Sequence, residues 1–127
     1  MGIKLIIAGT RSFKDAGLMY KEIAKLQDIK EITEVVSGHA RGADQMGEVW
    51  AQEHNIKVTL FPVTPFDWNR YGKVAGRLRN KKMADYADEA IVFWDGKSPG
   101  TFNMIYEMRH RDKYTTVIQY DNNCTQG

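Results

Sequence analysis

Three glycine-containing loops carry the residues of this chain that are best suited to bind an anion. They are GTRSF at residues 9–13, SGHARGAD at 37–44 and WDGKSPGT at 94–101. Each follows an apolar run and precedes a helix-like pattern, so backbone N–H groups and the positive end of a helix could converge on one negative group. Phosphate is the natural candidate, because glycine lets the backbone approach it and arginine can form two hydrogen bonds with it.

Individual loop residues have different expected roles. Gly38 and Gly42 would bring the backbone close to the phosphate, and Arg41 could pair with it. Asp44 could cap the following helix or hold a sugar hydroxyl. The predicted ligand-binding residues of the three loops are Gly9, Thr10, Arg11, Ser12, Phe13, Ser37, Gly38, Ala40, Arg41, Gly42, Asp44, Asp95, Gly96, Ser98, Gly100 and Thr101.

The elements that must position these loops alternate along the chain. Five short runs rich in β-branched and aromatic residues indicate strands, and stretches with apolar residues near the helical period lie between them. The predicted strands are residues 4–8, 32–36, 56–61, 89–94 and 114–119. This alternation predicts an α/β, Rossmann-like, doubly wound fold with a five-stranded, mainly parallel sheet and helices on both faces.

Ligands of such folds bind beyond the carboxyl ends of the strands, near the switch in strand order. A strand order of 3-2-1-4-5 would make the three loops neighbours in space. Glycine also occurs at strand-to-helix turns for purely geometric reasons. Three such loops at one edge, with Arg11 and Arg41 inside two of them, favour binding over turn formation.

Length and composition limit the function classes. The 127 residues, of which 43% are hydrophobic and 27% charged, fit one domain over residues 1–121 with a polar tail at 122–127. The net charge of +2 argues against a protein that coats nucleic acid. The apolar runs are too short to cross a membrane and the start of the chain reads as a strand, so we expect a cytoplasmic protein.

Metal and cofactor signals are weak. Cys124 is the single cysteine and the three histidines are scattered, so neither a disulfide framework nor a metal site is expected. The G-x-G-x-x-G fingerprint is missing after the first strand, and the second strand ends in Ser37 rather than an acid, which disfavours a nicotinamide cofactor. The GKS at residues 96–98 does not continue a P-loop motif. No cofactor is predicted.

The segment between the third and fourth strands has two unusual parts. Its first part holds Phe66, Trp68 and Tyr71 between prolines and a glycine, and could form a lid or stacking platform over a base. Packing or a dimer contact explains these aromatics equally well. The following helix places Lys73, Arg77 and Asn80 on one face, either as a solvated basic face or as an anion clamp. We include Trp68, Lys73, Arg77 and Asn80 among the predicted ligand-binding residues.

Four motifs of the chain resemble a known family in order and spacing. They are AGTRSF, VVSGHARGAD, YGKVAGRLRN and IVFWDGKSPGT. They are similar to the YspA-like, cpYpsA-related branch of the SLOG superfamily, which also contains the LONELY GUY phosphoribohydrolases and the DNA-processing protein A family. The resemblance covers nearly the whole chain and implies a Rossmann-like fold that binds a nucleotide or nucleotide-derived ligand at its glycine loops. Members of this branch are frequent in bacteria and phages.

The resemblance to the LONELY GUY enzymes is incomplete at their P-G-G-x-G-T-x-x-E stretch. Here Pro99, Gly100 and Thr101 match its glycine–threonine turn, but the nearest glutamate, Glu107, is displaced by three residues. Cleavage of an N-glycosidic bond needs a carboxylate to stabilise the cationic sugar or orient water. The candidate catalytic residues are Asp44, Asp95 and Glu107, with Asp15 as a further possibility.

Three functions from different classes therefore stay open. The first is a module that senses or sequesters a nucleotide-derived small molecule, and the second is a nucleotide N-glycosidase or related hydrolase. The third is binding of single-stranded DNA through Trp68 and the basic stretch 73–82, against which the net charge argues. We also expect a homodimer, because an aromatic surface would otherwise be uncovered. Its predicted members are Trp50, Phe61, Phe66, Trp68 and Tyr71.

Overall fold

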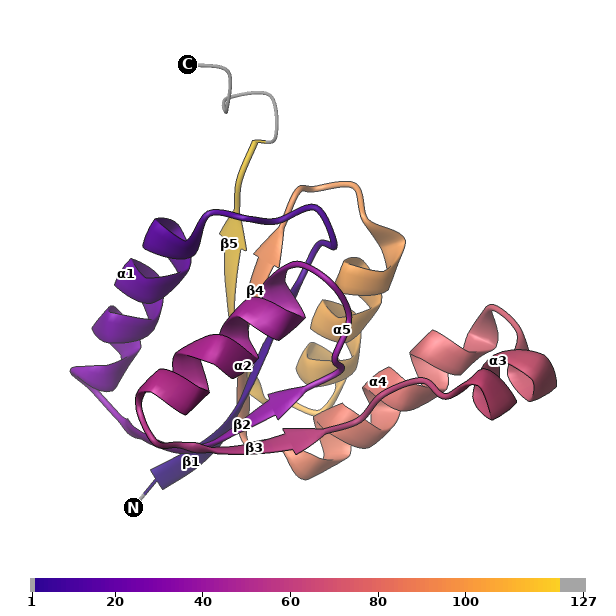
Figure 1. Ribbon diagram of the computed structural model, residues 1–127, viewed down its shortest axis with the longest axis horizontal. Helices are drawn as coiled ribbons and strands as arrows, with labels where there is room; N and C mark the ends of the chain where they lie inside the picture. Colours follow the sequence, from indigo (N-terminus) through magenta and orange to yellow (C-terminus); the bar gives the residue numbers. More distant parts are fainter. Residues whose placement is uncertain (1, 122–127) are drawn as a thin grey trace.

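The computed structural model describes residues 2–121, in which strands and helices alternate (Figure 1). The predicted polar tail, with Cys124, lies outside the described residues. In chain order the elements are β1 (Gly2–Gly9), α1 (Ala16–Gln27), β2 (Glu31–Ser37), α2 (Ala43–Glu53), β3 (Lys57–Leu60), α3 (Pro65–Tyr71), α4 (Val74–Tyr86), β4 (Glu89–Trp94), α5 (Pro99–His110) and β5 (Tyr114–Gln119).

The five strands form one parallel sheet in the order β3-β2-β1-β4-β5. The strand β1 is central, with Leu5 opposite Val35 on one side and Ile7 opposite Ile91 on the other. The predicted fold class is confirmed, and the strand order is the one that makes the three glycine loops neighbours. The strand order reverses direction between β1 and β4. Because the sheet is parallel, the carboxyl ends of β1, β2 and β4 lie at one edge, and the three glycine loops meet there.

Two hydrophobic layers cover the sheet, with α1 and α2 on one face and α4 and α5 on the other (Figure 1). Successive side chains of a strand point to opposite faces, so Leu5 and Ile7 pack under α1 and α2, while Ile6 and Ala8 pack under α4 and α5. Burial on both sides explains why β1 reads as a continuous apolar run. Trp50 is also in this core, only 2% exposed, so its inclusion in the predicted aromatic surface was wrong.

The helix α3 is the element with the least support from the rest of the chain. It begins at a capping box between Thr64 and Asp67 and ends at Gly72, which has a φ of 58°. None of its residues is buried, and it packs mainly on α4, beyond the end of the sheet (Figure 1). Phe66 and Tyr71 are therefore exposed.

Candidate functional site

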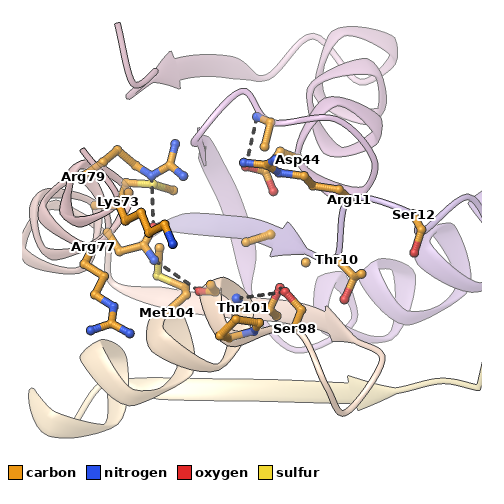
Figure 2. A pocket seen from close by; sticks show the side chains of 18 of the residues that line it. Thr10, Arg11, Ser12, Asp44, Lys73, Arg77, Arg79, Ser98, Thr101 and Met104 are labelled. Atoms are coloured by element: carbon orange, nitrogen blue, oxygen red, sulfur yellow. Dashed lines mark hydrogen bonds between the residues drawn. The ribbon is translucent and has the colours of Figure 1, made fainter. Parts of the chain in front are cut away.

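A pocket of about 640 Å³ opens at the carboxyl edge of the sheet, between the ends of β1, β2 and β4 and the helices α3, α4 and α5 (Figure 2). We call it the edge pocket. It is lined by Ala8, Gly9, Thr10, Arg11, Ser12, Ala40, Asp44, Trp68, Lys73, Gly76, Arg77, Arg79, Asn80, Met83, Ser98, Pro99, Gly100, Thr101 and Met104.

The structure brings residues of all three loops and of α4 to this pocket. The sequence-predicted binding residues on its wall are Gly9, Thr10, Arg11, Ser12, Ala40, Asp44, Trp68, Lys73, Arg77, Asn80, Ser98, Gly100 and Thr101. Seven others are not on the wall: Phe13, Ser37, Gly38, Arg41, Gly42, Asp95 and Gly96.

Most of the seven residues off the wall have structural contacts of their own. Phe13 is buried and stacks on Phe93, with ring centroids 4.9 Å apart. Ser37 is buried and donates a hydrogen bond to Glu48 Oε2 at 2.6 Å. Arg41 is exposed. These positions support the loops from behind or face outward.

Asp95 organises the loop between β4 and α5. Its Oδ1 accepts hydrogen bonds from the amides of Lys97 and Ser98, at 2.9 and 2.8 Å, and its own amide donates to Thr10 Oγ1. Burial acts to raise the pKa of Asp95, but the hydrogen bonds from Lys97, Ser98 and Thr10 together with its own backbone outweigh it, and the pKa lies below its ordinary value. Asp95 thus joins the β4 and β1 loops, and its carboxylate is engaged in hydrogen bonds within the loop. Gly96, with a φ of 83°, completes this turn.

Glu107 lies further along α5 and does not reach the edge pocket. It is 5% exposed, and its carboxylate accepts a hydrogen bond from Arg111 at 2.7 Å. Arg111 in turn donates to Asp85 on α4. Glu107 therefore belongs to an ion-pair network that joins α4 to α5.

Asp44 is the candidate catalytic residue that does line the pocket. It lies in the first turn of α2, is 5% exposed and accepts a hydrogen bond from the amide of Ala40 at 3.3 Å. Burial raises the pKa of Asp44 to about 6, against the opposing effects of the Arg79 charge and of the amides of Ala40 and Gly9. A carboxyl group with this pKa changes its protonation state near neutral pH.

Arg79 is a pocket residue that the helical spacing of Lys73, Arg77 and Asn80 did not include. Its guanidinium reaches across to the β2 and β3 loops, where Nη1 donates to the carbonyl oxygens of Gly38 at 2.7 Å and Phe61 at 3.2 Å. Burial and nearby Arg11 lower the pKa of Arg79, and Asp44 opposes them. A Cβ on Gly38 would come within 2.5 Å of Arg79 Nη1, so this glycine makes room for the arginine. In the sequence, the only sign of this contact is a glycine in the β2 loop and an arginine in α4, which is a weak signal.

Asn80 connects α4 to α5 beneath the pocket. It is 6% exposed, and its Nδ2 donates to Asn103 Oδ1 at 3.0 Å and to the carbonyl of Gly100 at 3.4 Å. Its Oδ1 accepts from Arg79 Nε at 3.0 Å. Asn80 therefore fixes the relative position of the two helices that flank the pocket.

The glycines in and around the pocket fall into two groups. Added Cβ atoms at Gly9 and Gly42 would lie 2.3 Å from the carbonyl oxygen of Phe93 and 2.4 Å from that of Arg11, so these glycines allow close packing of backbone. At Gly76 and Gly100 an added Cβ would meet nothing within 4 Å. Since both line the pocket, the second pair leaves space where a ligand could approach the backbone.

The pocket has a basic character. Arg11, Lys73 and Arg77 line it, and none of their side chains has a hydrogen-bond or ion-pair partner among residues 2–121. In Figure 2 Arg11 comes from the β1 loop, whereas Lys73 and Arg77 come from the α4 side. Such unpartnered cations suit an anionic ligand.

Within the described part of the chain, no group of three His, Cys, Asp or Glu side chains is placed to hold a metal ion. None of the described helices is long and apolar enough to cross a bilayer.

Fold and pocket together define an α/β protein with a pocket lined by cationic side chains at the switch point of a parallel sheet. The YspA, cpYpsA-related SLOG family matches residues 3–71, and the chain belongs to this family. It is also similar to the Gene 61 protein of Mycobacterium phage D29, with 36% identity over 110 residues that cover 82% of this chain and 86% of the relative. No solved structure gives a significant match.

Proposed function

We propose that the edge pocket binds a nucleotide or nucleotide-derived small molecule, which the protein senses or sequesters. The observation that carries this proposal is the set of unpartnered cations, Arg11, Lys73 and Arg77, in one pocket at the carboxyl edge. Membership of the SLOG family, which suggests nucleotide-related ligands, supports it.

The wall of the pocket suggests how such a ligand lies. Arg11, on the loop after β1, can bind a phosphate together with nearby backbone N–H groups. Trp68 of α3 also lines the pocket, is 44% exposed and offers a face on which a base can stack. Arg41 is exposed and off the wall, so we assign the phosphate contact to Arg11 instead.

The direct test is calorimetric titration of the full chain with common nucleoside monophosphates and diphosphates. Bound ligand and released base are measured separately, the latter by chromatography after incubation. We expect saturable binding with intact ligand recovered. Absence of binding by every nucleotide at millimolar concentration would contradict the proposal.

A second candidate function is hydrolysis of an N-glycosidic bond. Asp44 is the candidate catalytic carboxylate whose position suits this reaction. Asp44 is buried in the pocket wall with its pKa raised to about 6, as suits a general acid or base. Asp95 and Glu107 are off the wall and engaged elsewhere. If the chain is a hydrolase, Asp44→Asn should lower the rate of base release by about two decades or more while ligand binding persists. Unchanged release would exclude this role.

We further propose a homodimer formed through α3. Phe66 and Tyr71 are 66% and 44% exposed on this helix, which also carries Trp68 of the pocket wall. A two-fold contact there would cover them. Single-stranded DNA has less support, because Lys73 and Arg77 of the basic stretch line the pocket and the net charge is only +2.

A further inference from the structure

The edge pocket carries more positive charge than one phosphate group would need. Four cationic side chains line it, and Asp44 is the single acid among the lining residues. Arg79 is engaged with the carbonyl oxygens of Gly38 and Phe61 and lies near the charge of Asp44. Three cations remain for a ligand. A phosphate monoester carries about −1.5 to −2 charges at neutral pH, so it would leave part of this charge unmatched.

The three free cations lie on two separate elements. Arg11 follows β1, whereas Lys73 is the residue before α4 and Arg77 follows in its first turns. Figure 2 shows Arg11 on one side of the pocket and the α4 side chains on the other. Arg11 can therefore hold one phosphate group while Lys73 and Arg77 hold another.

Two glycines leave open space at the wall of the pocket. Gly76, one turn from Lys73 on α4, and Gly100, at the start of α5, both line the pocket, and an added Cβ at either would meet nothing within 4 Å. Gly76 lies in the first turn of α4, where glycine is less favourable than alanine by up to about 1 kcal/mol. Its presence is explained if a ligand passes over this part of α4.

We propose that the ligand of the edge pocket carries at least two linked phosphate groups, one bound at Arg11 and the β1 loop and the next at Lys73 and Arg77. This inference rests on the proposed nucleotide binding and specifies its chemical class: nucleoside diphosphates or pyrophosphate-linked nucleotides rather than monophosphates.

The test compares phosphate number with the base held constant. Adenosine and guanosine mono- and diphosphates and inorganic pyrophosphate are titrated into the full chain by calorimetry. Each diphosphate should bind at least about tenfold more tightly than its monophosphate, the effect of one further charge-assisted hydrogen bond. The Lys73→Met/Arg77→Met double variant should lose this preference, because its affinity for the diphosphate falls further than its affinity for the monophosphate.

A matched control is the Lys81→Met/Lys82→Met variant, which removes the same charge from exposed positions of α4 that do not line the pocket. It should keep the preference. Equal affinities for mono- and diphosphate in the unmodified chain, or a preference that survives in the Lys73/Arg77 variant, would overturn the inference and leave nucleotide binding intact. If no nucleotide binds at all, the proposed function itself fails.

Discussion

Asp44 places a carboxyl group in the wall of a pocket whose other charged side chains are basic. Its environment is divided: burial favours the protonated form, whereas Arg79 and the amides of Ala40 and Gly9 favour the carboxylate. Burial dominates, and the folded-state pKa of Asp44 is about 6. In the unfolded chain an aspartate has a pKa of about 3.9.

This difference predicts a pH dependence of stability. Between about pH 4 and pH 6 the folded protein keeps a proton on Asp44 that the unfolded chain has released, so the contribution of Asp44 to stability falls as the pH rises through this window. The Asp44→Asn variant cannot titrate there. Its free energy of unfolding relative to the parent should therefore rise by about 2 kcal/mol from pH 4 to pH 7, measured by urea denaturation. A difference that does not change with pH would show that Asp44 titrates normally.

Arg79 joins α4 to the ends of β2 and β3 through the carbonyl oxygens of Gly38 and Phe61. Replacing it with methionine should lower the free energy of unfolding by about 1.5 to 3 kcal/mol, because two carbonyl groups lose a charged donor. Lysine should restore part of the loss. The exposed Arg70 of α3, changed in the same way, is the control. Equal losses at both positions in chemical denaturation would contradict the assigned role.

Among the elements, the loop between β2 and α2 depends on a conformation that only glycine adopts easily. Gly42 has a φ of 78°, and an added Cβ would lie 2.4 Å from the Arg11 carbonyl oxygen and 2.6 Å from that of Thr10. Gly42→Ala should therefore cost about 2 kcal/mol or more in thermal or chemical unfolding. A neutral effect would show that the two loops can move apart.

Gly76 of α4 should behave in the opposite way. An added Cβ there meets nothing within 4 Å, so Gly76→Ala should stabilise the helix by about 0.5 to 1 kcal/mol. The same methyl group should weaken ligand binding, since Gly76 lines the pocket. Greater stability with unchanged affinity would mean that the ligand does not pass over α4.

The elements themselves could be predicted because burial on both sides leaves continuous apolar runs, as in β1 and β4. The glycine loops could be placed at one edge because a parallel sheet brings its carboxyl ends together. Arg79 could not be found by spacing. It is one residue away from Asn80 along the helix, and only its length lets it reach Gly38. Arg41 lies in a glycine loop as Arg11 does, but the structure places only Arg11 of the two on the pocket wall.

At the scale of the whole molecule, α3 presents an exposed aromatic surface. Trp50 is in the core and Phe61 packs against Tyr86, so Phe66 and Tyr71 remain as the exposed aromatics of the predicted dimer surface outside the pocket. We expect light scattering at micromolar concentration to give twice the 14.6 kDa mass of one chain. Phe66→Ser with Tyr71→Ser should give the single mass. A monomeric parent protein would contradict a dimer through α3.

We propose that the cationic pocket at the sheet edge holds a phosphate at Arg11. Arg11 and Arg41 form a matched pair for the measurement, because both are exposed arginines in glycine loops but Arg11 alone of the two lines the pocket. With the tightest nucleotide of the panel, calorimetry should show Arg11→Ala weakening binding by about 1.5 to 3 kcal/mol, the range for a charged hydrogen bond, and Arg41→Ala leaving the affinity unchanged. Loss of binding in the Arg41 variant with full affinity in the Arg11 variant would contradict the account.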